Sequence, residues 1–212
     1  MQEHILTTLR TGRYFTLGSR EHAADIWIVC HGYGQLAARF LDRFRMIADD
    51  TRCIVAPEGL SRFYLSESPT ERRVGASWMT KEDRLHEIED YVRYLDALHN
   101  QVAGGKTSIT ALGFSQGTAT VCRWAALSVS ARIDRLILWG GEVPPDLDLG
   151  ERVAARLRQI KVTLVYGDRD EFFTPKVVAA TEARLRAHGI SYDRVSYGGG
   201  HELHGDTLRT LL

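Results

Sequence analysis

The stretch TSITALGFSQGTATVCRWAAL, residues 107–127, decides the fold of this chain. Residues 107–112 are rich in β-branched and apolar side chains and predict a β-strand. Residues 118–127 are typical of a helix. The pentapeptide GFSQG between them therefore puts Ser115 at the junction of a strand and a helix.

Two glycines frame this serine. A residue exposed on so sharp a turn needs neighbours without a Cβ atom two positions to either side, because Cβ atoms there would collide with the crossing strand and helix. Gly113 and Gly117 supply both, and the pattern predicts a nucleophile elbow. The alternative is that Ser115 is a loop serine that caps the following helix.

Outward from this stretch, apolar runs with β character alternate with helical periodicity, which indicates an α/β fold. The chain has 212 residues and a mass of 23.8 kDa, so we expect one domain over residues 1–212. Five or six strands should lie parallel, with helices on both faces. The expected strands are residues 25–30, 53–56, 107–112, 133–139, 162–166 and 192–197.

Two further segments complete the expected architecture. Residues 4–9 and 14–17 flank a turn that contains Gly12, and they predict an N-terminal antiparallel hairpin. Residues 57–80 lack clean periodicity and predict a long loop over one edge of the sheet. No long insertion follows residues 133–139, so no helical cap is expected.

Composition excludes several classes of protein. The formal net charge is zero and the pI is about 7.1, which gives no electrostatic reason for binding nucleic acid. No apolar run approaches the length of a membrane span. Cys30, Cys53 and Cys122 lie in apolar segments and are an odd number, as expected for reduced thiols. We therefore expect a soluble, cytoplasmic protein.

Several motifs carry a resemblance to a known family. They are HGYG at 31–34, APEG at 56–59, SWM at 77–79, GFSQG at 113–117, GDRDEFFTP at 167–175 and GGGH at 198–201. The chain resembles the phospholipase/carboxylesterase group of α/β-hydrolases, which includes acyl-protein thioesterases. The resemblance implies an α/β-hydrolase fold, a triad of Ser115, Asp170 and His201, and hydrolysis of carboxylic esters or thioesters without a cofactor.

The chemistry of these residues supports the same assignment. A serine hydroxyl is a poor nucleophile unless an imidazole takes its proton, and a carboxylate must hold that imidazole in the correct tautomer. In this fold the order serine, acid, histidine is expected, each at the carboxyl end of a strand. Ser115, Asp170 and His201 follow strand-like runs in that order.

The base and the acid each have competitors. His201 follows its strand directly, whereas His204 should begin or precede the terminal helix. Asp168 lies close to Asp170 and is expected to organise the turn through nearby backbone amides. Glu142 could be the acid if that group came from the preceding strand. Relatives commonly have a proline one position earlier than Pro175.

Backbone N–H groups are the expected donors to the developing oxyanion. The N–H of Gln116 follows the nucleophile, and the N–H of Tyr33 follows the turn at His31, which is expected to hold this loop in shape. Because side-chain substitutions leave backbone donors in place, variants of Tyr33 and Gln116 are expected to be mild. A flexible glycine turn is the alternative interpretation of HGYG.

Large apolar side chains in the loops are the candidates for substrate binding. Trp78, Met79, Phe172 and Phe173 either line a concave site or seal the core beneath it, and the sequence favours neither. Arg72 and Arg73 could pair with an anionic substrate group. We leave both out of the predicted site, because adjacent arginines in a charged loop are usually solvated.

A metal site is not expected. His201 and His204 are three residues apart, whereas a helical zinc site needs histidines four apart on one face. The sequence therefore predicts a serine hydrolase of small or medium acyl esters, possibly thioesters, that is a monomer or a homodimer. The alternatives are a hydrolase-like small-molecule receptor with little or no turnover and a peptidase or lactonase that uses the same triad.

Overall fold

The computed structural model describes residues 1–212 except 22, 67, 69, 71 and 104–107. The strands are β1 (Tyr14–Leu17), β2 (Asp25–Cys30), β3 (Arg52–Pro57), β4 (Ser61–Tyr64), β5 (Val74–Ser77), β6 (Ser108–Phe114), β7 (Arg135–Trp139), β8 (Lys161–Gly167) and β9 (Tyr192–Tyr197). The helices are α1 (Ala37–Leu41) with the 3-10 helix η1 (Asp42–Phe44), α2 (Arg84–Val102), α3 (Gln116–Leu127), α4 (Glu151–Leu157), α5 (Pro175–Ala187) and α6 (Gly205–Thr210).

A seven-stranded sheet in the order β1-β3-β2-β6-β7-β8-β9 forms the centre of the molecule. β1 runs antiparallel to β3, and the other six strands of this sheet are parallel to one another. This topology confirms the expected α/β-hydrolase fold with its mostly parallel sheet. Thr107 of the expected central strand, Pro69 of the expected loop and His22 lie outside the described residues.

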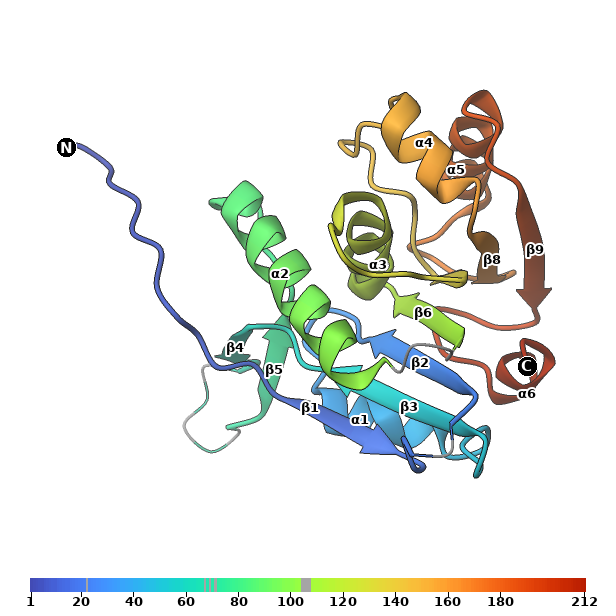
Figure 1. Ribbon diagram of the computed structural model, residues 1–212, viewed down its shortest axis with the longest axis horizontal. Helices are drawn as coiled ribbons and strands as arrows, with labels where there is room; N and C mark the ends of the chain where they lie inside the picture. Colours follow the sequence, from blue (N-terminus) through green and yellow to red (C-terminus); the bar gives the residue numbers. More distant parts are fainter. Residues whose placement is uncertain (22, 67, 69, 71, 104–107) are drawn as a thin grey trace.

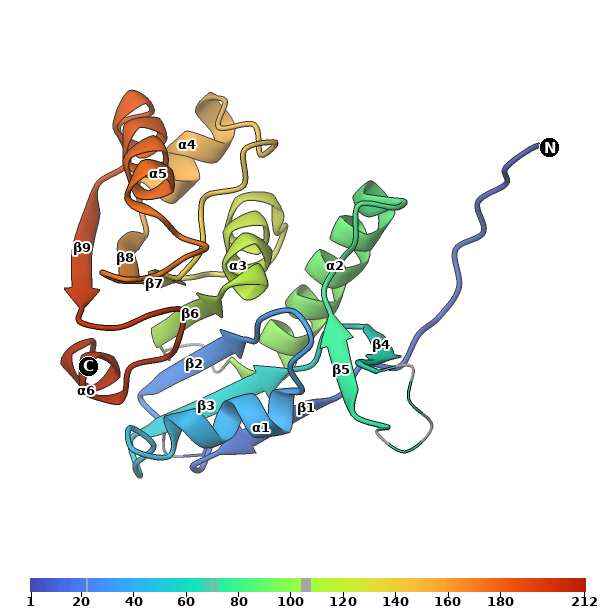
Figure 2. The ribbon, with the colours of Figure 1, turned by 180° about the vertical axis from the view of Figure 1, so that it is seen from behind.

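Alternate side chains of each strand enter two separate cores. Ile26 and Ile28 of β2 belong to the core under α2, α3, α4 and α5, and Trp27 and Val29 belong to the core under α1, η1 and α6. Figures 1 and 2 show the same division of helices between the two faces. Because both faces are covered, the central strands are buried along most of their length.

The N-terminal segment differs from its prediction. Residues 1–13 have no regular secondary structure, and Figure 1 shows them leading away from the body of the molecule. The expected antiparallel pairing exists, but β1 pairs with β3 rather than with residues 4–9. Gly12 approaches α2 instead of forming a hairpin turn, since a Cβ there would lie 2.4 Å from the Tyr94 ring. Pairing with β3 prevails because it joins β1 to a buried sheet.

Residues 57–80 are not one long loop. β4 and β5 pair as an antiparallel hairpin, and Gln35 forms an isolated bridge with Ala76 of β5. Each strand has only four residues. No residue of β4 is fully buried, so its sequence lacks the alternation of apolar and polar side chains that marks a strand. Gly75 permits close approach, because a Cβ there would lie 2.5 Å from the carbonyl oxygen of Gly34.

Within the described ranges, no helix is both long and apolar enough to cross a bilayer.

Candidate active site

Ser115 lies between β6 and α3 in a conformation that residues with a Cβ atom rarely adopt, with φ 55° and ψ −119°. Its N–H donates to the carbonyl oxygen of Trp139 at the end of β7 (2.9 Å). The Thr118 hydroxyl donates to the carbonyl oxygens of Gly113 and Trp139. These bonds hold a strained turn against the neighbouring strand.

The glycines on either side of Ser115 allow this close packing. A Cβ on Gly113 would come within 2.1 Å of the Gly117 carbonyl oxygen, and a Cβ on Gly117 would come within 2.1 Å of the Cys30 carbonyl oxygen. No side chain can be accommodated at such distances. The prediction that both positions exclude a Cβ atom is confirmed.

Asp170 and His201 form a hydrogen-bonded pair. Nδ1 of His201 lies 2.8 Å from Oδ2 of Asp170, whose side chain is fully buried. The other carboxylate oxygen accepts the N–H groups of Phe172 (2.9 Å) and Phe173 (2.8 Å). Both oxygens therefore face donors, which suits an ionised carboxylate that orients the imidazole.

The loops after β6, β7, β8 and β9 bring this pair close to the elbow. The His201 ring packs 4.9 Å from the ring of Phe114, the residue before Ser115. Gly140, which follows β7 and has φ 57°, lies against the Asp170–His201 pair. A Cβ there would lie 3.2 Å from Nδ1 of His201 and 3.3 Å from Oδ2 of Asp170. Ser115, Asp170 and His201 thus leave the carboxyl ends of three strands at one edge of the sheet.

The competing acids occupy other positions. Oδ1 of Asp168 accepts the N–H of Gly199 (3.0 Å), so Asp168 organises the turn as expected. Glu142 is half-buried after β7, and the partner of the His201 Nδ1 is Asp170. Pro175 begins α5, so the extra residue before it lengthens the loop without displacing Asp170.

His31 is buried beneath the loop that follows β2. Its Nε2 accepts the N–H of Gly59 (3.0 Å), so Nδ1 carries the proton and donates to the carbonyl oxygen of Gly32 (2.8 Å). Burial lowers the pKa of His31, and the weaker opposing effects of the Gly32 bond and the Glu58 charge do not reverse this shift. The neutral imidazole, with a hydrogen bond at each ring nitrogen, fixes the shape of the loop.

Glu58, which the sequence did not single out, supports the same loop. Its buried carboxylate forms ion pairs with Arg13 (2.6 Å) and Arg62 (3.3 Å). It also accepts a hydrogen bond from the N–H of Ala37 at the start of α1 (3.3 Å). Burial would raise the pKa of Glu58, but these bonds outweigh it and hold the pKa below its ordinary value. Glu58 therefore joins the APEG segment to the start of α1, the helix that follows the HGYG loop.

The backbone donors of the HGYG loop are mostly occupied. The N–H of Gly32 donates to Oε1 of Gln35, that of Gly34 to the carbonyl of Ala76, and that of Gln35 to the carbonyl of Gly32. Among the described residues the N–H of Tyr33 has no acceptor. The N–H of Gln116, at the first position of α3, also has no partner within its helix.

The side chain of Gln116 has a role that the sequence did not reveal. Its Nε2 donates to the Met79 carbonyl (2.8 Å) and to the Ser77 hydroxyl (3.1 Å), and its Oε1 accepts the N–H of Trp78 (3.1 Å). Gln116 therefore ties the elbow to the segment after β5. Because its side chain supports neighbouring backbone, we expect a Gln116 variant to be less mild than the sequence alone suggests.

The four apolar pocket candidates lie in different environments. Trp78 is buried, its ring lies 5.1 Å from that of His31, and its Nε1 donates to the His31 carbonyl (2.9 Å), so it seals the core. Phe173 is also buried, against Tyr166. Met79 packs against the core formed with α2 and α3. Phe172 is exposed, and its ring lies 4.9 Å from that of His201.

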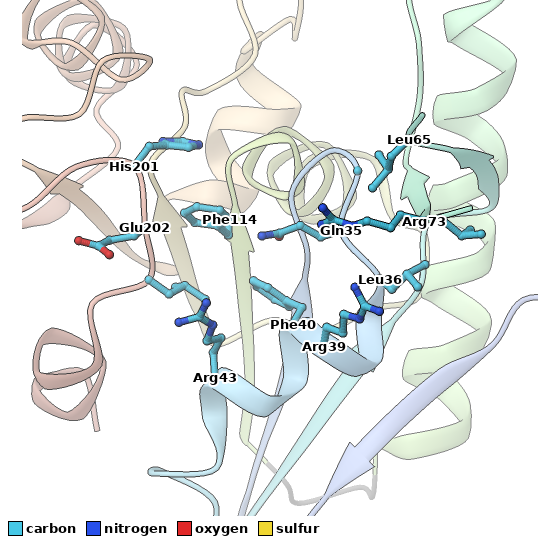
Figure 3. Close-up of a pocket in the computed structure, with 13 residues that line it drawn as sticks. Gln35, Leu36, Arg39, Phe40, Arg43, Leu65, Arg73, Phe114, His201 and Glu202 are labelled. Carbon is cyan, nitrogen blue, oxygen red and sulfur yellow. The ribbon is translucent and has the colours of Figure 1, made fainter. Parts of the chain in front are cut away.

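A cavity of about 390 Å³ opens beside His201 (Figure 3). None of the four candidates belongs to its lining as far as the structure is described. Its walls come from the HGYG loop, α1, η1, the β4–β5 hairpin and the segment after His201. The lining residues are Gly34, Gln35, Leu36, Arg39, Phe40, Arg43, Leu65, Arg73, Val74, Phe114, His201, Glu202 and Leu203.

His204 is the N-cap of α6 and accepts the N–H of Thr207, which agrees with its expected position at the start of the terminal helix. Its ring stacks on Tyr197 with centroids 5.1 Å apart. In the part of the chain that the structure describes, no group of three His, Cys, Asp or Glu side chains could hold a metal ion. His204 is therefore accounted for by helix capping and packing.

Comparison with known structures supports the fold. Maize acyl-protein thioesterase 2 has a TM-score of 0.77 at 17% identity, covering 95% of this chain and 96% of that one. A carboxylesterase from Mesorhizobium loti has a TM-score of 0.72 at 20% identity, covering 98% and 95%. A phospholipase/carboxylesterase from Dyadobacter fermentans has a TM-score of 0.67 at 18% identity, covering 97% and 96%.

Sequence comparison identifies the family. No curated protein matches the sequence. The family model described as phospholipase/carboxylesterase matches residues 14–212, which include the Ser115 elbow, the HGYG loop and the Asp170–His201 pair. The chain is therefore a hydrolase that belongs to the phospholipase/carboxylesterase family of α/β-hydrolases.

Proposed function

We propose that this protein is a serine hydrolase that cleaves carboxylic esters, and possibly thioesters, of small or medium acyl groups through Ser115, His201 and Asp170. The observation that carries the proposal is the 2.8 Å bond between the His201 imidazole and the buried Asp170 carboxylate, beside the strained turn at Ser115. A buried carboxylate in this position stabilises the imidazolium that forms when histidine takes a proton.

The reaction begins with attack of the Ser115 hydroxyl on the ester carbonyl carbon. Nε2 of His201 takes the hydroxyl proton, while Nδ1 keeps its hydrogen bond to Asp170. The carbonyl oxygen becomes an oxyanion, and the N–H groups of Tyr33 and Gln116 are the proposed donors to it. Both groups are fixed by backbone structure before reaction, so no reorganisation is needed when charge develops.

Collapse of the tetrahedral intermediate breaks the bond to the alcohol or thiol, which leaves with the proton from His201. The acyl group remains on Ser115. A water molecule then attacks the acyl carbon and gives a proton to His201, and the second collapse releases the carboxylic acid and returns the proton to Ser115. Phe172, beside His201, is the one of the four apolar candidates that we retain for substrate contact.

Short p-nitrophenyl esters are the first substrates to test. Ser115→Ala should abolish their hydrolysis while the circular dichroism spectrum stays unchanged. A fluorophosphonate probe separates an enzyme from a hydrolase-like receptor, because it labels an activated serine covalently. Undiminished hydrolysis by a folded Ser115→Ala variant would contradict the proposal.

We also propose that this activity belongs to a single cytoplasmic domain, monomeric or homodimeric, over residues 1–212. Cys30, Cys53 and Cys122 are buried and unpaired, and burial raises the pKa of each thiol, which suits a reducing compartment. Light scattering of the purified protein measures its oligomeric state, and cell fractionation measures its location.

A further inference from the structure

The cavity beside His201 has a cationic wall. Arg39 of α1, Arg43 of η1 and Arg73 before β5 belong to its lining. Glu202 also belongs to the lining, but its carboxylate is directed away from the arginines in Figure 3. The formal charge of these four side chains is 3 − 1 = +2. The whole chain, in contrast, has a formal net charge of zero, so positive charge is concentrated at this cavity.

These arginines differ from several exposed arginines elsewhere on the molecule. Arg45 pairs with Asp42 at 2.8 Å, and Arg158 pairs with Glu151 at 2.8 Å. Among the described residues, no carboxylate lies within ion-pair distance of Arg39, Arg43 or Arg73. Their guanidinium groups are thus available to a ligand that enters the cavity.

Figure 3 shows how the three arginines are arranged. Arg39 and Arg43 rise from one helical segment, and Arg73 reaches toward Gln35 from the other side of the cavity. The ring of Phe40 lies between Arg43 and Arg39 in this view, and the ring of Phe114 lies between Arg43 and His201. An anion in the cavity would therefore meet cations from two separate elements.

Apolar side chains strengthen this electrostatic effect. Leu36, Phe40, Leu65 and Phe114 belong to the same lining, and Phe40 and Phe114 are buried. Low-dielectric walls concentrate the field of nearby charges, so an anion is attracted more strongly in such a cavity than at an open surface. Planar guanidinium groups also match the geometry of carboxylate and phosphate oxygens.

We propose that this cavity selects esters or thioesters that carry an anionic group, a carboxylate or a phosphate, close to the scissile bond. The proposal rests on the proposed function, because His201 is both the proposed base and part of the cavity wall. A volume of about 390 Å³ suits a short substrate whose charged end reaches the arginines while its ester group lies beside His201 and Phe114, the residue before Ser115.

A matched pair of esters tests this selectivity. The anionic member is the mono-p-nitrophenyl ester of glutaric acid, and the neutral member is the same compound with its free carboxyl converted to a methyl ester. The rate without enzyme is subtracted for each, because the free carboxylate of the anionic ester also attacks its own ester group. We expect kcat/KM to be at least about tenfold higher for the anionic ester at low ionic strength, and the ratio to fall as salt screens the cavity. A ratio of one or below that is insensitive to salt would overturn the proposal.

Variants connect the preference to the arginines. Arg39→Gln/Arg43→Gln should reduce the ratio of the two kcat/KM values by about tenfold, since two charge-assisted contacts are lost. Glu202→Gln should raise the ratio only slightly, by less than about threefold, because its carboxylate points away from the arginines. Arg132→Gln is the matched control: this arginine is exposed far from the cavity lining and should leave both rates unchanged. An equal effect of Arg132→Gln would show general charge rather than a site.

A binding measurement separates this proposal from the proposed function. Glutarate and inorganic phosphate are titrated by calorimetry into Ser115→Ala and into Ser115→Ala/Arg39→Gln/Arg43→Gln. Binding that is lost when the arginines are replaced supports the anion site even if no ester is hydrolysed. The anion that binds more tightly shows whether the site prefers a carboxylate or a phosphate. Absence of binding by both anions, together with hydrolysis of neutral esters, would overturn the anion site alone.

Discussion

The histidines after β2 and β9 lie in regions that use the same side chain for different purposes. His31 is fully buried, and both of its ring nitrogens are bonded to backbone groups. His201 is partly exposed, and its Nδ1 faces a carboxylate. In the described part of the chain, Nε2 of His201 has no hydrogen-bond partner. The residue type is thus less informative than what occupies each ring nitrogen.

The largest expected effect separates these two histidines. His201→Gln should reduce kcat for p-nitrophenyl esters by about 10⁴-fold, because the proposed base is lost. His31→Gln should reduce the Tm by several degrees, because a buried side chain with two hydrogen bonds is lost. It should retain much more activity than His201→Gln. Steady-state kinetics and thermal unfolding of both variants measure the contrast. Equal losses of kcat would contradict the distinction.

The next effect compares the two aspartates after β8. Asp170→Asn should reduce kcat by about 10³- to 10⁴-fold, because an amide cannot stabilise the imidazolium as a carboxylate does. Asp168→Asn is the matched control and should reduce kcat less than tenfold, as its contact is to the backbone of Gly199. Glu142→Gln should behave like Asp168→Asn. A larger loss for either control would identify a different acid.

A smaller effect distinguishes the two proposed oxyanion positions. Gln116→Ala should reduce kcat/KM by about tenfold, because its amide no longer holds the Trp78 and Met79 backbone groups. Tyr33→Ala should change kcat/KM by less than about threefold, since its backbone N–H remains and its side chain is largely exposed. Similar kinetics for the two variants would show that the Gln116 bonds do not position the site.

The smallest effect is a pH dependence of stability from His31. The folded-state pKa of His31 lies below its unfolded value near 6.5, so the unfolded chain binds its proton first as pH falls. Stability from neutral His31 is complete above that pH and decreases below it, by at most about 1.4 kcal/mol per pH unit. Thermal unfolding at pH 7.5 and 5.5 should show a larger decrease for the wild type than for His31→Gln.

The turn at Ser115 and the chain order of the three proposed catalytic residues could be predicted from the sequence, because they depend on local rules. Gly113 and Gly117 are required by contacts within one turn, and those contacts are present. Each strand is a short apolar run, and parallel strands bring their carboxyl ends to one edge. Ser115, Asp170 and His201 follow three such strands.

Features that depend on distant segments could not be predicted in this way. β1 pairs with β3, which is distant in sequence, and not with the segment next to it across the turn at Gly12. Arg39 and Arg43 lie on a short helical segment whose pattern is that of an ordinary solvated face. Arg73 joins them only because the β4–β5 hairpin folds over the HGYG loop. The pocket walls are thus a property of tertiary structure.

The most direct measurement of the central claim is the rate of fluorophosphonate labelling, followed by intact mass and peptide mapping. Wild-type protein and Asp168→Asn should acquire one adduct on Ser115 at similar rates. Ser115→Ala should acquire none, and His201→Gln should react far more slowly. Labelling of His201→Gln at the wild-type rate, or an adduct on another residue, would contradict activation of Ser115 by the Asp170–His201 pair.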